Sequence, residues 1–235
     1  MTEARVVPID RLELAYETYF WSFADERRAH IDAHWQKLVR DKPSMWNGQV
    51  LMMHRWAVED RTFRGALFAC DFASFLAWRD WDYPDDGVKN GFPAAAIRCA
   101  DGAFLLGVQG AHTANAGMVY FPAGMVDMSD VKGASVDLGA NVWREVGEET
   151  GLTRADLTEI PGWTSVLIGP RVAHIKTLHS AERAEVLRER ILAFMAREKE
   201  PELADIVIAR KPADCDGRFA PFVMAFLNSV WSSAG

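Results

Sequence analysis

Apolar residues recur at helical spacing near the start of the chain. Ile31, Trp35 and Leu38 lie among charged neighbours in residues 24–40, which predicts an amphipathic helix that ends before Pro43. The same period predicts further helices at 73–81, 181–197 and 221–231. In the longest of these, four apolar residues share one face and are expected to be buried: Val186, Ile191, Phe194 and Met195.

Short apolar runs bounded by turn residues predict the strands. They lie at 49–53, 63–69, 94–99, 104–108, 118–121, 163–168, 171–178 and 205–209. The turn at Asp101 and Gly102 makes the third and fourth runs a hairpin. A breaker cluster at 83–87 predicts a boundary between an N-terminal α+β extension, 1–86, and a main domain, 87–235. Helices around a mixed sheet give an α/β (α+β) fold class.

Composition narrows the classes of function. Hydrophobic residues make up 49% of the 235 positions, as in a globular protein, and the apolar runs are too short to cross a bilayer. The formal net charge of -7 argues against non-specific nucleic-acid binding, which depends on Lys and Arg. The N-terminus lacks the pattern of a secretory signal, and the three cysteines lack metal-ligand spacing. These features predict a cytoplasmic protein without membrane or nucleic-acid partners.

The strongest chemical signal is a group of three carboxylates near the middle of the chain. Glu145, Glu148 and Glu149 stand at spacings i, i+3 and i+4, so in a helix they point to one side. Gly151 marks the expected end of that helix at Thr150, because glycine enters the left-handed conformation without a Cβ penalty. Carboxylates grouped in this way suit a divalent cation. The alternative is a solvated acidic helix face.

A strand end and a turn precede the acidic helix. Residues 118–121 are followed by Pro122, Ala123 and Gly124, and this turn would bring free backbone carbonyls close to the carboxylates. The carbonyl of Ala123 or Gly124 is therefore a further candidate metal ligand, since hard cations prefer oxygen ligands.

Residues 144–152 read Arg-Glu-Val-Gly-Glu-Glu-Thr-Gly-Leu, which resembles the second half of the Nudix box. That family hydrolyses diphosphates linked to a nucleoside or similar group. The resemblance implies an α/β/α sandwich, Mg²⁺ or Mn²⁺ held by Glu145, Glu148 and Glu149, and Arg144 as the support of a box glutamate. Such a cation would neutralise the diphosphate and activate water.

The first half of the box departs from the family pattern. Where the family has a glycine and a glutamate, this chain has Asp130 and Val136. If Gly124 is the loop glycine, the loop is longer than usual, and Asp127 or Asp137 is expected to replace the missing glutamate.

Two weaker resemblances point to different substrates. The order of residues 46–48, 71–75 and 79–80 is similar to the leading domain of UDP-sugar-cleaving members, which implies a nucleotide sugar. The loop at 121–127 is similar to that of the coenzyme A diphosphatases. A third reading, from another class, is a Nudix-fold module that senses a nucleotide without cleaving it. The extension could also serve as a homodimer interface.

Several other residues have two readings. His174 and Lys176 alternate along a predicted strand and contact either substrate phosphates or solvent, while Arg98 and Arg171 suit phosphate by residue type. Family members often supply one further glutamate as ligand or base after that strand, where this chain has three, each of which also fits an ordinary charged helix face: Glu182, Glu185 and Glu189. Three tryptophans could stack on a base, although most tryptophans pack in cores: Trp46, Trp78 and Trp81.

Overall fold

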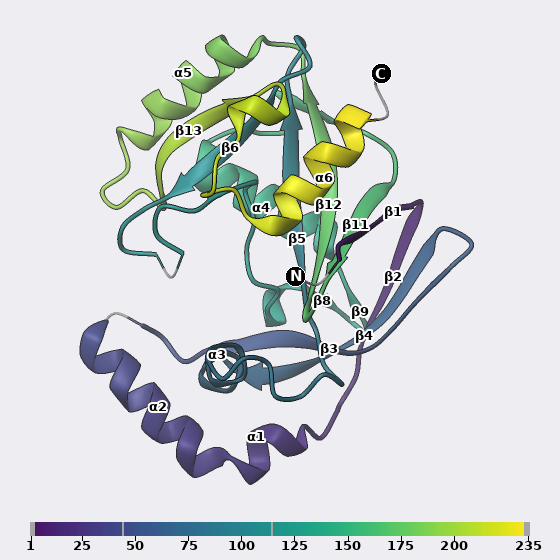
Figure 1. The fold of residues 1–235 in the computed structure, drawn as a ribbon, viewed down its shortest axis with the longest axis vertical. Helices are drawn as coiled ribbons and strands as arrows, with labels where there is room; N and C mark the ends of the chain where they lie inside the picture. Colours follow the sequence, from purple (N-terminus) through teal and green to yellow (C-terminus); the bar gives the residue numbers. More distant parts are fainter. Residues whose placement is uncertain (1–2, 44, 114, 233–235) are drawn as a thin grey trace.

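The computed structural model describes residues 3–43, 45–113 and 115–232, which form two mixed sheets and the helices around them (Figure 1). The larger sheet has the order β1-β11-β12-β5-β6-β13, with β10 beside β12 and β7 beside β6. Its strands are β1 (Arg5–Ile9), β5 (Asn90–Arg98), β6 (Phe104–Gln109), β7 (Val119–Tyr120), β10 (Leu157–Glu159), β11 (Trp163–Ile168), β12 (Arg171–Ser180) and β13 (Leu203–Ala209). The central pair β12 and β5 is parallel, and the other pairs are antiparallel.

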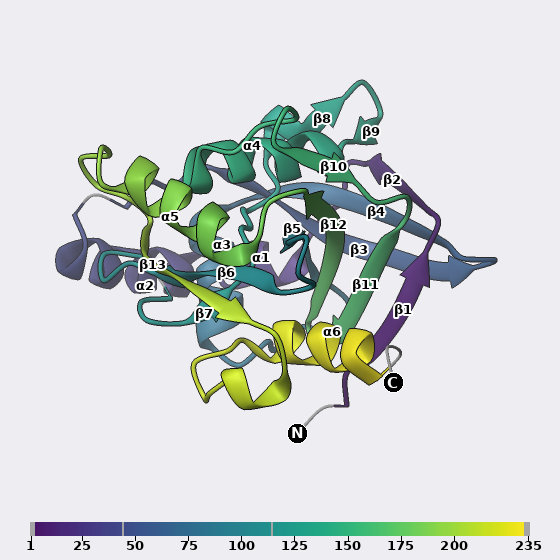
Figure 2. The ribbon, with the colours of Figure 1, turned by 90° about the horizontal axis from the view of Figure 1, so that it is seen from above.

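Helices cover both faces of this sheet. They are α4 (Leu138–Thr150), α5 (Ala184–Met195) and α6 (Pro221–Ser232). Figure 2 shows α4 and α5 on one side of the strands and α6 on the other. Each side has its own core: Phe226 of α6 packs over Phe104 and Phe121, while Val146 of α4 shares the opposite core with Leu187 of α5. The expected α/β class, with helices on both faces of a mixed sheet, is confirmed.

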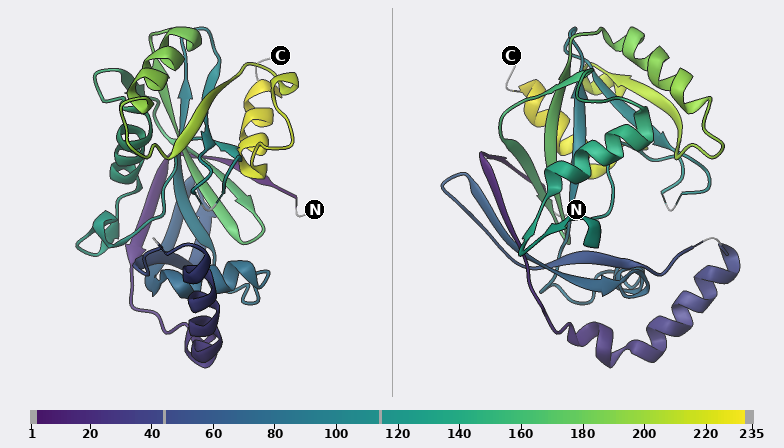
Figure 3. Two further views of the ribbon diagram at one scale, coloured as in Figure 1. Left: turned by 90° about the vertical axis from the view of Figure 1, so that its left-hand side faces the viewer. Right: turned by 180° about the vertical axis from the view of Figure 1, so that it is seen from behind.

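The smaller sheet has the order β3-β4-β2-β9-β8. Its strands are β2 (Arg11–Tyr16), β3 (Gln49–Glu59), β4 (Thr62–Asp71), β8 (Val131–Lys132) and β9 (Ser135–Val136). The helices α1 (Ser22–Glu26), α2 (Arg28–Asp41) and α3 (Phe72–Asp80) lie at the same end of the molecule, as both views of Figure 3 show. Buried aromatic residues such as Phe68 and Trp78 join these helices to β3 and β4.

The two sheets exchange strands across the expected domain boundary at residue 86. Strand β1, from the N-terminal extension, pairs with β11 of the larger sheet. The β8–β9 hairpin, from the loop before α4, joins β2 of the smaller sheet, and the backbone of Leu51 donates to the carbonyl of Val126 at 2.8 Å. The extension and the loop of the acidic site therefore hold each other in place.

Most predicted elements are present within a few residues, with three differences. The first helix is broken at Arg27 into α1 and α2. The strands β1, β2, β8, β9 and β10 were not predicted, because they are short or half-buried. In α5 the buried face consists of Ala184, Leu187, Ile191 and Met195. Placing Val186 on that face was wrong: it is 50% exposed, because it lies one position before Leu187, which is the buried residue.

Candidate functional site

Helix α4 begins and ends with local signals that fix its position. The side chain of Asp137 accepts from the backbone N–H of Ala140 at 3.0 Å and caps the N-terminus. Gly151 ends the helix in the left-handed conformation with φ of 69°, and a Cβ there would meet the ring of Phe194. The helix therefore ends at Thr150 as predicted, and Asp137 serves as its cap.

Glu145 points inward from α4 against the loop before it. The residue is 6% exposed, and a Cβ on Gly124 would overlap its carboxylate, so the loop approaches this closely only because residue 124 is glycine. Burial raises the pKa of Glu145 to about 7; the neighbouring guanidinium of Arg144 opposes the rise, and Glu148 adds to it. The structure thus buries an acidic group at a position that favours its neutral form.

Glu149 lies one turn further along the same face and is 4% exposed. Its Oε1 accepts from the backbone N–H of Ala123 at 3.1 Å, while its Oε2 is buried and has no hydrogen-bond partner among the described residues. Burial raises the pKa of Glu149 well above the ordinary value, although the bond from Ala123 opposes this. A buried carboxylate oxygen without a donor is costly unless a proton or a cation meets it.

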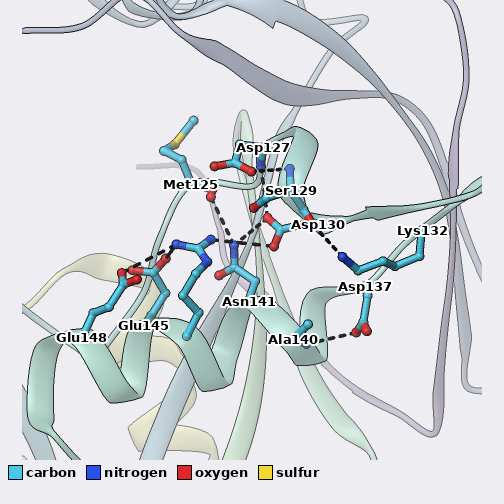
Figure 4. Close-up of polar contacts among 11 residues, drawn as sticks. Met125, Asp127, Ser129, Asp130, Lys132, Asp137, Ala140, Asn141, Glu145 and Glu148 are labelled. Atoms are coloured by element: carbon cyan, nitrogen blue, oxygen red, sulfur yellow. Dashed lines mark hydrogen bonds and ion pairs between the residues drawn. The ribbon is translucent and has the colours of Figure 1, made fainter.

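Arg144 lies among the carboxylates. Its Nη1 is 2.5 Å from Oε1 of Glu145 and 3.7 Å from Oε2 of Glu148, whose side chain is 63% exposed. Figure 4 shows the carboxylates of Glu145 and Glu148 side by side. In the described part of the chain, no group of three His, Cys, Asp or Glu side chains is close enough to hold a metal. The guanidinium instead neutralises part of the acidic charge.

These residues nevertheless fit a hard cation. Mg²⁺ is usually held by one or two carboxylates, with waters and substrate phosphates completing the shell. Glu145 and Glu149 offer carboxylate oxygens on one face, beside the loop at Ala123 and Gly124. Oε2 of Glu149 has no hydrogen-bond partner among the described residues and is therefore free to bind a cation. A cation there would meet the unpartnered oxygen of Glu149 and add to the partial compensation that Arg144 gives Glu145.

A third aspartate of the loop before α4, Asp130, approaches Arg144. Asp130 is 2% exposed, accepts from Nδ2 of Asn141 at 2.8 Å, and places Oδ1 at 3.7 Å from Nη2 of Arg144 (Figure 4). Asp127 and Asp137, the two substitutes considered from the sequence, instead cap the short helix at Met128–Asp130 and helix α4. The only sequence signal for Asp130 was its place in the extended loop.

A further glutamate near the site comes from the segment before β13. Glu202 is exposed, and its charge contributes to the raised pKa of both Glu145 and Glu149. Its backbone carbonyl accepts from the N–H of Gly110 at 2.7 Å. No spacing in the sequence indicated it, because the fold alone brings this segment to α4.

The sequence suggested three glutamates as a further metal ligand or general base, and all three lie on or next to α5. Glu182 pairs with Arg190, Glu185 lies 2.5 Å from Arg210, and Glu189 is exposed. All three belong to a charged surface of that helix region, which is the ordinary reading of such residues.

Three of the four expected phosphate-contact residues have partners away from the carboxylates of α4. His174 is fully buried, 2.8 Å from Oγ of Ser165 by its Nδ1, and packs edge-on against Phe63. Lys176 is 8% exposed and 3.4 Å from Oε2 of Glu159. Arg98 lies over the ring of Phe104. The structure does not bring these three together with α4.

A pocket opens on the other side of the Ala123–Gly124 loop. Its walls come from α3, β5, β7, the start of β12 and the start of α6, and include Arg79, Tyr120 and Arg171. Trp78 also lines it, though Trp78 is fully buried and donates from Nε1 to the carbonyl of Asp85 at 2.8 Å. Trp46, which is 78% exposed, and Trp81 do not line it.

No protein-family model and no curated protein matches this sequence. Solved structures with a related arrangement are Nudix hydrolases at low identity. RenU from M. smegmatis is 17% identical over 62% of this chain and 86% of its own, with a TM-score of 0.36. A Nudix hydrolase from Nitrosomonas europaea is also 17% identical, over 62% of this chain and 90% of its own, with a TM-score of 0.39. The pyrophosphohydrolase BsRppH from Bacillus subtilis is 14% identical over 80% and 98%, with a TM-score of 0.36.

Among the described residues, no helix is long and apolar enough to span a membrane.

Proposed function

We propose that the chain is a Nudix hydrolase that uses Mg²⁺ or Mn²⁺ to cleave the diphosphate bond of a nucleoside diphosphate derivative with water. The observation that carries the proposal is the pair Glu145 and Glu149, buried on one face of α4 against a glycine loop, with Oε2 of Glu149 left without a partner among the described residues. A structural acidic helix face would be exposed to solvent.

Each residue of the proposed site has a distinct role. Glu145 and Glu149 would hold the cation with the carbonyl of Ala123 or Gly124, and Glu148, exposed beside them, would complete the shell. The cation would neutralise phosphate oxygens and lower the pKa of a bound water. Arg144, held between Asp130 and Glu145, would keep the carboxylates in position.

Glu202 is the proposed general base. It is an exposed carboxylate whose charge acts on both buried glutamates, so it could accept a proton from a water at the solvent side of the site. Glu182 and Glu185 are held in ion pairs elsewhere and are less suitable.

The test is a panel of UDP-glucose, ADP-ribose, coenzyme A and NADH, each with Mg²⁺ or Mn²⁺ and with EDTA. We expect metal-dependent turnover of at least one, lowered at least a hundredfold by Glu148→Gln, because a metal ligand is lost while the fold is kept. Glu198→Gln, which removes another exposed charge from the segment that follows α5, is the matched control and should be fully active.

Two results would contradict the proposal. One is an inert protein that a diphosphate nevertheless stabilises, which is the behaviour of a nucleotide-sensing module. The other is turnover that persists in Glu148→Gln at the level of the control. Which diphosphate is hydrolysed distinguishes a nucleotide-sugar hydrolase from a coenzyme A diphosphatase.

A further inference from the structure

The pocket beside the acidic site combines aromatic walls with positive charge. Rings come from both halves of the chain, among them Phe72 of α3, Phe92 of β5 and Phe222 of α6. The lining includes two arginines, Arg79 and Arg171, and no Asp or Glu among the described residues. In a protein with a net charge of -7, an aromatic pocket with cations and no lining carboxylate favours an aromatic ligand that carries negative charge.

The pocket also contains polar atoms that have no use within the protein. Arg171 and Asn90 are register partners at the starts of β12 and β5. Nε of Arg171 and Oδ1 of Asn90 are both buried without a hydrogen-bond partner among the described residues. One is a donor and the other an acceptor, and both lie just behind the surface of the pocket, so the protein leaves hydrogen-bonding capacity unused beside it. Unsatisfied polar atoms at a pocket wall are typical of a ligand site.

Besides burial, the pKa of Tyr120 is affected both by arginines of the pocket and by a glutamate of the acidic site. Burial raises the pKa of Tyr120 to about 12; Glu149 adds to the rise, while Arg171 and Arg79 oppose it. Ala123, which donates to Glu149 on one side, lines the pocket on the other. The loop at Ala123 therefore separates the pocket from the buried carboxylate of Glu149.

Arg79 connects this pocket to the N-terminal extension. It lies near the end of α3, its Nε donates to Oδ1 of Asp80 at 2.8 Å, and its side chain is 33% exposed. Opposite it, α6 begins at Pro221, another lining residue, so the positive end of that helix dipole adds to the field of the arginines. The main domain alone would lack the wall formed by α3.

We infer that this pocket binds the nucleoside monophosphate half of the diphosphate substrate, with its ring among Phe72, Phe92 and Phe222 and its phosphate near Arg79 and Arg171. This inference rests on the proposed function, and it assigns the N-terminal extension to substrate specificity within the same chain. The pocket has a volume of about 250 Å³, which suits one ring system and its phosphate, because pockets for larger ligands span roughly 300–1,000 Å³.

The experiment measures binding by calorimetry in EDTA, so that it does not depend on the metal or on turnover. The probes are adenosine and uridine 5′-monophosphates, compared with ribose 5-phosphate, which lacks the ring, and adenosine, which lacks the phosphate. At least one monophosphate should bind roughly tenfold or more tightly than either comparator, since ring and phosphate each contribute.

Arg79→Ala is the diagnostic variant, because the partly exposed side chain is not part of a core. It should weaken monophosphate binding roughly tenfold, through the lost charge-assisted contact, and leave adenosine binding unchanged. Arg40→Ala, an exposed arginine of α2 outside the lining, is the matched control. The inference is overturned if ribose 5-phosphate binds as tightly as both monophosphates, or if Arg79→Ala binds them like Arg40→Ala.

Glu148→Gln separates this result from the proposed activity. It should keep monophosphate binding while losing hydrolysis. If the monophosphate binds and no diphosphate is hydrolysed by the wild type, the proposed function fails and the pocket assignment stands. If hydrolysis occurs but Arg79→Ala has an unchanged KM and monophosphate affinity, the pocket assignment fails alone.

Discussion

Asp71 in the N-terminal extension and Glu149 in α4 are both shielded from solvent, Asp71 partly and Glu149 almost fully, and the protein satisfies the two carboxylates in opposite ways. In the N-terminal extension, Asp71 accepts from Nη1 of Arg28 at 2.8 Å and from the hydroxyl of Ser74. Burial alone would raise the pKa of Asp71, but the bonds from Arg28 and Ser74 outweigh it, and the pKa is lowered. In α4, Glu149 has one donor for two oxygens, and its pKa is raised well above the ordinary value.

Asp71 is therefore a structural carboxylate, whereas Glu149 lacks a full set of partners within the protein. Asp71 joins α2 to the start of α3, and its charge is satisfied without any ligand. Glu149 and Glu145 are as buried as core residues; Glu145 has the guanidinium of Arg144 beside it, but Oε2 of Glu149 has no donor among the described residues. Unmatched burial of this kind is concentrated at functional sites, where a ligand or ion completes the arrangement.

The largest expected effect tests whether burial without a charged partner is the cause of a shifted pKa. His174 has only a neutral partner, Ser165, and burial lowers its pKa to about 3. A lowered pKa contributes stability that is present above the unfolded value of 6.5 and lost as the pH falls toward 3. At about pH 4.5 the loss is roughly 3 kcal/mol, at about 1.4 kcal/mol per unit.

His174→Asn keeps a hydrogen-bonding group near Ser165 and cannot titrate. Urea unfolding at about pH 7 and pH 4.5 should therefore show a smaller acid-induced loss of unfolding free energy in the variant than in the wild type. Parallel losses in the two proteins would show that burial does not control the charge of this group.

The second prediction concerns the cation. A hundredfold excess of Mn²⁺ over its dissociation constant should stabilise the wild type by about 2.7 kcal/mol, which is a rise in melting temperature of roughly 5–10 °C for a chain of this size. Thermal unfolding with and without Mn²⁺ measures it. Glu149→Gln should lose the rise and Asp71→Asn should keep it, because only Glu149 is a proposed ligand. An equal rise in both variants would remove the distinction between the two regions.

The third prediction compares the same two variants without metal. Asp71→Asn should lower the free energy of unfolding by about 2 kcal/mol, since it breaks a charge-assisted bond to Arg28 and leaves that cation only its longer ion pair with Asp32 and its bond to Ser74. Glu149→Gln should raise it by about 1 kcal/mol at pH 8, because the amide keeps the bond from Ala123 and removes a buried ionisable group. Urea unfolding in EDTA gives both values; loss of stability in both would mean that Glu149 is as well satisfied as Asp71.

The sequence predicted the parts of the site that depend on local geometry. The end of α4 at Gly151 and the grouping of Glu145 and Glu149 both follow from helical spacing and one glycine. The larger sheet was also predictable, because its strands β5, β6, β11 and β12 are apolar runs bounded by turns.

The rest depends on contacts between distant segments. Glu202 approaches the glutamates of α4, and Arg79 approaches Tyr120, only through the strand order and the arrangement of the two sheets, which no periodicity in the sequence predicts. His174 and Lys176 have residue types that suit phosphate, yet the register of β12 places them in the interior. Asp130 could not be identified as a partner of Arg144 from the sequence, because the loop that carries it is longer than the loop of the family pattern.

The smallest expected effect concerns Asp130, the residue that faces Arg144 from the loop. Asp130→Asn keeps the shape and removes the charge 3.7 Å from Nη2 of Arg144, so the guanidinium should shift toward Glu145 and compete with the cation. We expect kcat to fall roughly tenfold, equal to about 1.4 kcal/mol, with KM unchanged, because Asp130 positions Arg144 and touches no substrate. More Mn²⁺ should restore part of the rate.

Asp216→Asn removes the same charge from an exposed pair with Arg218 and serves as the control for a change in net charge. Steady-state kinetics of both variants, measured across Mn²⁺ concentrations, distinguish a positioning role from a structural one. A purely structural role would lower the melting temperature and the amount of active enzyme without changing the dependence on Mn²⁺. An Asp130→Asn enzyme with the kcat and Mn²⁺ dependence of the control would show that Arg144 is held by the glutamates alone.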